Sequence, residues 1–225
     1  MKFSILSVNS IFVKAIVKII LCFLTCHAFA QQVAILKYSG GGDWYANPTA
    51  VPNLVKFTNA HIKTALDTDV QVVSPTDQAI FNYPVLFMTG HGHVSFTDDE
   101  ITKLKTYLKS GGFLHISDNY GMDRYIRPLI AELFPNQPLT ELPNDHPIFH
   151  QTFNFPQGLP KIHEHDKKRP EALGVFYEGR LVILYDFECD LSDGWEDPAV
   201  HNDPEEVRMK ALKMGANIIE YAFKH

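Results

Sequence analysis

The sequence predicts an α/β fold, a flavodoxin-like three-layer α/β/α sandwich around a mostly parallel sheet. Short apolar runs alternate with amphipathic helical patterns through residues 31–225, which is typical of parallel strands covered by helices. The run VLFMT at 85–89 is continuously apolar, as expected of a central strand that is buried on both faces. Because 31–225 contains no internal repeat and no long linker, we expect a single domain.

The first half of this pattern predicts three strands and one helix. VAILKY (33–38) is the first strand, and the following helix over 52–66 has apolar residues at helical spacing. A short strand at 70–73 precedes the central strand at 85–89. In a flavodoxin-like sheet the strands 33–38 and 85–89 are neighbours.

The second half begins with a clearly marked helix. Thr97 and Glu100 predict a capping box at its start, and Gly111 ends it. We expect a strand at 113–117 and a helix at 123–134. After this helix we expect irregular structure over 135–170 and two strands within 174–188 joined at Glu178-Gly179. The chain then ends in a helix with Asp203 as N-cap and Pro204 in its first turn.

Residues 1–30 predict a signal peptide that is cleaved after Ala30. Lysines precede and interrupt an apolar run that ends in Ala28-Phe29-Ala30. Lys18 splits the run, which leaves less than the roughly 20 apolar residues that a membrane span needs. We therefore expect export to the periplasm or the extracellular space, with no integral membrane segment in the mature chain.

The charge balance excludes some classes of partner. Three of the 20 basic residues and none of the 26 acidic residues lie in 1–30, so 31–225 carries 17 positive and 26 negative charges, a net charge of −9. Nucleic acids and anionic membrane surfaces require basic patches, so we expect neither as a partner. Two of the three cysteines also lie in 1–30. Cys189 therefore has no disulfide partner, and we expect a buried, inert thiol.

Candidate ligand-binding residues gather where the predicted strand order reverses. Ligands of such sheets bind outside the carboxyl ends of the strands at this point. The fold places 39–48 beside 90–96, with 117–121 next to them. Trp44 and Tyr45 suggest a platform for a sugar or another polar ring, although Trp44 could instead pack on the core. The candidate ligand-binding residues are Asp43, Trp44, Tyr45, Gly90, Gly92, Asn119 and Tyr120.

Three residues of this region are candidates for catalysis. His91 or His93 could act as a general acid or base with Asp118 as partner, as in a hydrolase or isomerase. The same imidazoles, with Asp43 and Asp118, would also suit a zinc-type site. The alternative is a histidine that only hydrogen-bonds the loop backbone. The sequence leaves the metal and any cofactor open.

Three other polar segments are interpreted as structural. NDHPIFH (144–150) is predicted to form a turn pinned to the core, and HEHD (163–166) a charged, solvated loop. DLSDGWED (190–197) carries four carboxylates, but its spacing is not that of an EF-hand. We therefore expect a solvated acidic loop there rather than a calcium site.

Five motifs together resemble one family. GGDWY, FMTGHG, LKSGGFLHISD, DHPIFH and DGWED, in this order over about 33–223, resemble the bacterial domain of unknown function 4159 family. This resemblance implies a class I glutamine-amidotransferase-like fold, similar to ThuA-like proteins. Working amidotransferases carry a nucleophilic cysteine in a G-x-C-x-G elbow, whereas this chain has Thr89-Gly90-His91-Gly92-His93. The departure argues against glutaminase activity.

The favoured hypothesis from the sequence is a secreted protein that binds a small polar ligand, with carbohydrate as one candidate. The alternative is the hydrolase or isomerase described above. A structural subunit of an envelope complex is compatible with the acidic surface, but no motif supports it.

Overall fold

A seven-stranded sheet forms the centre of the computed structural model, which describes residues 32–225. The predicted signal peptide and its cleavage site lie outside the described residues. The strands are β1 (Val33–Leu36), β2 (Gln71–Val73), β3 (Val85–Gly90), β4 (Phe113–Asp118), β5 (Thr140–Glu141), β6 (Glu171–Tyr177) and β7 (Arg180–Phe187).

The strand order is β2-β1-β3-β4-β7-β6-β5. β2, β1, β3, β4 and β7 pair in parallel, and β6 is antiparallel to both of its neighbours. The predicted adjacency of the strands near 33–38, 85–89 and 113–117 is confirmed. The order 2-1-3-4 is also that of flavodoxin-like sheets, with the reversal between β1 and β3.

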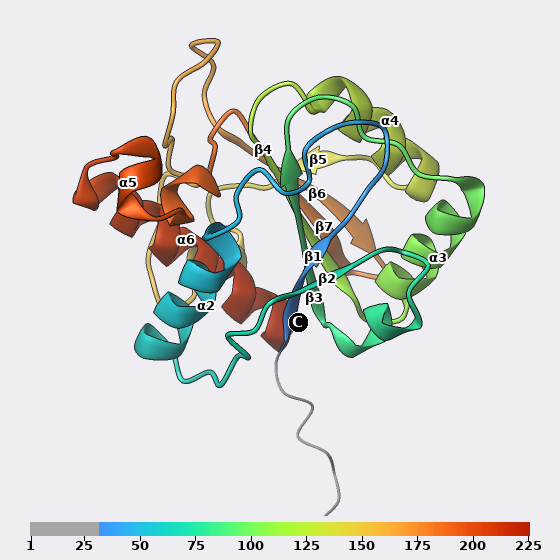
Figure 1. Cartoon of the computed structure of the whole chain (residues 1–225), viewed down its shortest axis with the longest axis horizontal. Coiled ribbons are helices and arrows are strands. Elements are labelled where there is room, and N and C mark those ends of the chain that lie inside the picture. Colours follow the sequence, from blue (N-terminus) through green and yellow to red (C-terminus); the bar gives the residue numbers. More distant parts are fainter. Residues whose placement is uncertain (1–31) are drawn as a thin grey trace, which may run out of the picture.

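Helices cover both faces of the sheet, which confirms the three-layer prediction. α2 and α6 lie on one side of the sheet and α3 and α4 on the other (Figure 1). Within 32–225, no helix has both the length and the apolar character to cross a membrane. The helices are α2 (Ala50–His61), α3 (Asp98–Lys109), α4 (Asp123–Leu133), α5 (Pro198–His201) and α6 (Glu205–Lys224), with short 3₁₀ turns η1 (Gln78–Asn82), η2 (Pro147–Phe149) and η3 (Asp193–Trp195).

The alternation of side chains along the strands builds the two cores. In β3, Val85 and Phe87 face the core under α2 and α6, whereas Leu86 and Met88 face the core under α3 and α4. All six residues of β3 are buried. Successive side chains of a strand point to opposite faces, so an apolar run fills both cores.

The helix starting at Asp98 has the predicted cap. The Thr97 side chain accepts a hydrogen bond from the backbone N–H of Glu100, and the Glu100 carboxylate accepts one from the backbone N–H of Thr97. The sequence therefore located this helix start correctly, because the cap depends only on residues close in sequence.

Two helix ends differ from the prediction. α2 ends at His61 rather than at 66, because the Asn59 side chain accepts hydrogen bonds from the Leu66 N–H and the Thr64 hydroxyl and holds the chain in a turn. At the start of α6 the N-cap is Pro204, with no side-chain cap. The predicted cap residue Asp203 accepts a hydrogen bond from the ring of His163 instead.

Candidate functional site

The loops after β1, β3 and β4 meet at one edge of the sheet, as predicted. Ser39 pairs with Ser95 in an antiparallel bridge, and the N–H of Gly42 donates to the carbonyl of His93 at 2.9 Å. The Asn119 N–H donates to the Gly90 carbonyl at 3.3 Å. Backbone hydrogen bonds therefore hold the three loops together at the carboxyl ends of the strands.

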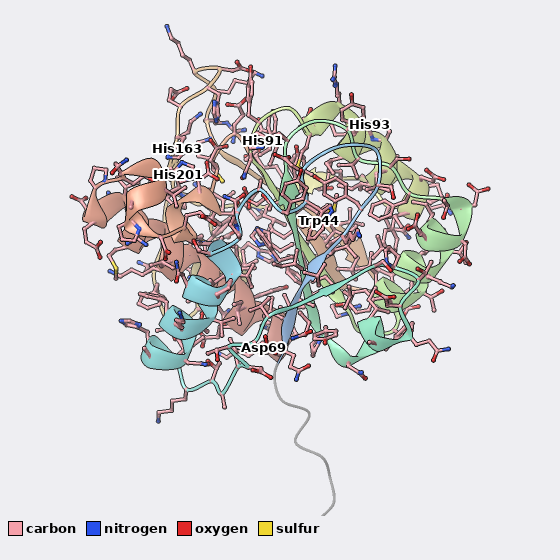
Figure 2. All side chains as sticks on the ribbon, viewed as in Figure 1. Trp44, Asp69, His91, His93, His163 and His201 are labelled. Atoms are coloured by element: carbon pink, nitrogen blue, oxygen red, sulfur yellow. The ribbon has the colours of Figure 1, made fainter. Side chains whose placement is uncertain are left out.

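His91 and His93 do not share a site. The Nδ1 atom of His91 lies 3.0 Å from a carboxylate oxygen of Asp43, and the other oxygen accepts the His91 backbone N–H. The ring of His93 packs on Tyr125, with 4.6 Å between ring centroids. Figure 2 labels the two histidines at separate places on the upper rim. The structure therefore does not bring them together as a metal-binding pair.

The two glycines beside His91 have different roles. Gly90 has φ +141°, and a Cβ there would lie 2.2 Å from the Tyr38 hydroxyl oxygen. Gly90 therefore allows the Tyr38 side chain to pack closely against the loop. Gly92 has φ +74°, and a Cβ added there would meet no atom within 4 Å. It lines a cavity at the carboxyl ends of β4 and β7.

Three more of the predicted ligand-binding residues do not line this cavity: Trp44, Tyr45 and Asn119. Trp44 packs against the core beneath α3 and α4, with Lys37 above its ring at 5.5 Å. Tyr45 is 64 % exposed and contacts Trp44 edge to face. Asn119 is buried, and its side chain bonds to Asn47 and Ser192. The position of Trp44 agrees with the alternative prediction, in which its ring packs on the core.

A cavity of about 470 Å³ lies at the carboxyl ends of β4 and β7. Its volume is in the range usual for small-molecule sites. We call it the acidic pocket, because five carboxylates line it against two permanent cations. The lining residues are Gly92, Asp118, Tyr120, Gly121, Asp123, Arg124, His165, Asp166, Lys168, Phe187, Glu188 and Asp190.

Asp118 brings a buried carboxyl group to this pocket. It is the last residue of β4 and is 3 % exposed. Its carboxylate accepts hydrogen bonds from the Met122 N–H and the Tyr185 hydroxyl, each at 3.0 Å. Burial raises the pKa of Asp118 to about 6, against the lowering effect of these two donors. A carboxyl group that titrates near neutrality in a cavity is suited to proton transfer.

Strained backbone conformations cluster around the acidic pocket. Tyr120, Glu188 and Asp190 line it and have φ values of +84°, +59° and +51°. Positive φ is unfavourable for residues with side chains, and such strain is concentrated at functional sites. The Tyr120 ring stacks on His165 at 4.5 Å and is 48 % exposed. An accessible aromatic face therefore lies beside the carboxylates.

The prediction of a solvated loop at 190–197 was wrong. Residues 189–196 are all buried. The Trp195 indole donates to the Ala211 carbonyl at 2.8 Å, and Glu196 accepts the N–H groups of Thr49 and Ala50 at the start of α2. Carboxylates that a linear pattern assigns to solvent are here the caps and anchors of neighbouring helices.

The segment 163–166 is also more than a solvated loop. The Nδ1 atom of His163 lies 3.0 Å from Asp193 and 3.6 Å from Asp190, and its Nε2 lies 3.0 Å from Asp203. The nearby carboxylate of Asp190, and then those of Asp193 and Asp203, raise the pKa of His163 to about 10. His165 bonds to Asp190 through Nε2. Sequence reasoning missed this group; its only signal was two histidines and several aspartates in separate segments.

A second buried polar group lies on β4, on β7 and just after β7. Asp186 accepts hydrogen bonds from the His115 ring at 2.6 Å and from the Cys189 thiol at 3.0 Å, and all three residues are buried. Burial raises the pKa of the Cys189 thiol. The predicted burial of Cys189 is therefore confirmed. A buried thiol with a raised pKa is a poor nucleophile, which agrees with the expected lack of reactivity.

Comparison with known proteins agrees with the resemblance noted in the sequence. No curated protein matches the chain. The model of one family, described as a domain of unknown function (DUF4159), matches residues 32–223, which is the whole of the α/β sandwich apart from its last two residues. The chain therefore belongs to the DUF4159 family.

Proposed function

We propose that this protein binds a small polar ligand in the acidic pocket, and that the ligand is rich in hydroxyl groups or carries a positive charge. The observation that carries the proposal is the combination of a cavity of about 470 Å³ with five lining carboxylates. Carboxylates accept hydrogen bonds from hydroxyl and ammonium groups. An anionic ligand would meet repulsion from the same groups.

The arrangement of aromatic and acidic groups favours carbohydrate within this class. The exposed face of Tyr120 lies beside the carboxylates, and sugars commonly need both a flat apolar face and hydrogen-bond acceptors. Lys168 reaches Asp166 at 3.3 Å and Glu188 at 3.6 Å, so the cation offsets only part of the pocket's negative charge.

An enzyme remains the second candidate, because one observation favours it. Asp118 is buried in the pocket wall with a pKa near neutrality, which suits a general acid or base of a hydrolase or isomerase. His91 and His93 do not line the pocket. In this version of the alternative, Asp118 acts without the two imidazoles that the sequence suggested.

Thermal-shift screening followed by calorimetry would test the binding proposal. We expect glucose-type sugars, aminosugars or polyamines to stabilise the protein, and sugar phosphates to have no effect. Glu188→Gln and Tyr120→Ala should weaken binding, whereas Glu132→Gln, an exposed control on α4, should not. Binding that survives both pocket substitutions would show that the ligand lies elsewhere.

Export is part of the proposal and needs its own test. The lysine-rich start and the Ala28-Phe29-Ala30 end of the apolar run support cleavage after Ala30. N-terminal sequencing of the protein from the producing cell should begin at Gln31. Recovery of an uncleaved Met1 form from the cytoplasm would contradict export.

A further inference from the structure

We infer that His163, Asp193 and His201 form a binding site for a divalent transition-metal ion such as Zn²⁺. The three side chains come from the loop before β6, from η3 and from α5. One ligand atom of each lies within 4.8 Å of the others. Two imidazoles with one carboxylate are a common ligand set for Zn²⁺ and for related divalent ions. Figure 2 shows His163 and His201 next to each other beside α5.

The distances suit shared coordination. Ligand atoms on a tetrahedral Zn²⁺ with bonds of about 2.0–2.1 Å lie about 3.3 Å apart. His163 Nδ1 is 3.0 Å from one oxygen of Asp193, and His201 Nε2 is 3.9 Å from the other. The two separations, which are measured to different oxygens of Asp193, lie below and above the expected value. Rotation of the His201 side chain would therefore bring one ligand atom of each residue around one ion.

Neighbouring side chains hydrogen-bond two of the three ligands, as they commonly do around bound metal ions. Metal-bound histidines usually donate their second ring N–H to a carboxylate, and His163 Nε2 lies 3.0 Å from Asp203. Asp193 is held on its other side by the Asn47 amide, which donates to it at 2.7 Å. Hydrogen bonds to neighbouring residues therefore hold His163 and Asp193 near their ligand positions before an ion binds.

An unpaired buried oxygen next to the cluster is a further, independent observation. The side chain of Asp190 is 2 % exposed, and one of its carboxylate oxygens has no hydrogen-bond donor within the described part of the chain. Its other oxygen is 3.6 Å from His163 Nδ1. The His165 ring already bonds that second oxygen. A buried carboxylate oxygen without a donor is costly, and a nearby cation would offset this cost.

The site is accessible and separate from the acidic pocket. His201 retains 30 % exposure of its side chain and His163 24 %, so an ion can reach them from solvent. None of the three ligands lines the pocket, although Asp190 contacts both regions. Metal binding therefore does not require that the pocket binds a ligand.

Titration of the purified protein with Zn²⁺ alone would test the site. The protein should be made without a polyhistidine tag, stripped with a chelator and titrated by calorimetry, with Co²⁺ absorption as a second measurement. We expect one ion per chain. His201→Gln should lower the affinity at least tenfold, and Asp203→Asn about 10–100-fold, as expected for loss of an outer carboxylate.

His61→Gln is the matched control, because His61 lies at the end of α2 and its ring contacts the carbonyl and the ring of Phe57. It should bind Zn²⁺ as the parent protein does. His201 is partly exposed on the short α5, so its substitution should leave the fold intact, which circular dichroism can check. The inference fails if the parent shows no saturable binding of one ion, or if folded His201→Gln binds as tightly as His61→Gln.

Discussion

The two pairs of histidines at the carboxyl edge of the sheet differ in how the chain brings them together. His91 and His93 are separated by one residue, yet they contact different partners, because Gly92 turns the chain between them with φ +74°. His163 and His201 are far apart in sequence, yet their ring centroids are 5.0 Å apart. Proximity in sequence is therefore a poor guide to a shared site at this edge.

The two regions also differ in what holds them. The rim loop (residues 90–93) is held by close backbone packing, and its side-chain contact between His91 and Asp43 is exposed. The cluster of His163, Asp193 and His201 depends on carboxylates that are almost fully buried. Removing one partner of an exposed charge pair costs little, whereas removing one partner of a buried pair costs much more, because the other group is left buried without compensation. The following predictions test this difference, from the largest expected effect to the smallest.

Gly90→Ala should be the most destabilising of these changes. A methyl group there would meet the Tyr38 hydroxyl and the Asp43 backbone, and φ +141° is unfavourable for alanine. We expect a loss of about 4 kcal/mol or more, as for severe strain combined with overpacking. Gly92→Ala, which meets no atom within 4 Å, should cost only about 1–2 kcal/mol. Urea denaturation of both variants measures the difference, and equal losses would contradict it.

Asp118→Asn should change how stability depends on pH. The folded-state pKa of about 6 lies above the ordinary value of 3.8. The contribution of the protonated Asp118 to the free energy of unfolding is therefore fully present below pH 3.8. It is lost as the pH rises through 6. The difference between these two pKa values corresponds to about 3 kcal/mol in the free energy of unfolding.

The asparagine variant has no carboxyl group to ionise at this position. Its stability relative to the parent should therefore increase between pH 4 and pH 7, by up to about 3 kcal/mol, when both proteins are denatured with urea at each pH. A stability difference between the two proteins that stays constant over this range would mean that Asp118 titrates at its ordinary pKa.

Asp193→Asn and Asp43→Asn compare the two regions directly. Asp193 is 8 % exposed and contacts both His163 and Asn47, so its neutralisation in metal-free protein should cost about 2–3 kcal/mol. Asp43 pairs with an exposed histidine, and its neutralisation should cost less than about 1 kcal/mol. Chemical denaturation at pH 7 measures both losses. A larger loss of stability for Asp43→Asn than for Asp193→Asn would contradict the conclusion that the buried carboxylates stabilise the His163 region.

Much of the fold could be predicted from the sequence, because its signals are local or periodic. The apolar run at 85–89 indicated a central strand, and all of β3 is buried. The capping box at Thr97 depends on residues three positions apart. The end of α2 was missed because Asn59 binds the backbone of Leu66, an interaction that hydrophobic periodicity does not describe.

The candidate site could be predicted only in part. Topology correctly placed the loops after β1, β3 and β4 together, and Asp118, Tyr120 and Gly92 do line the pocket. The other wall comes from the residues after β7 and from the loop before β6. A sequence pattern cannot show that acidic residues such as Asp190 are buried, because burial depends on which distant segments pack over them.

His91→Ala should have the smallest effect on stability. Alanine retains the backbone N–H that donates to Asp43, so only the exposed ring contact is lost, worth about 0.5 kcal/mol. The melting temperature should fall by less than about 3 °C. Because His91 does not line the acidic pocket, a ligand found in the screen should bind the variant as it binds the parent protein, in contrast to the catalytic role that the sequence suggested. A normal melt with abolished binding would place the ligand at the rim loop and would restore His91 as a functional residue.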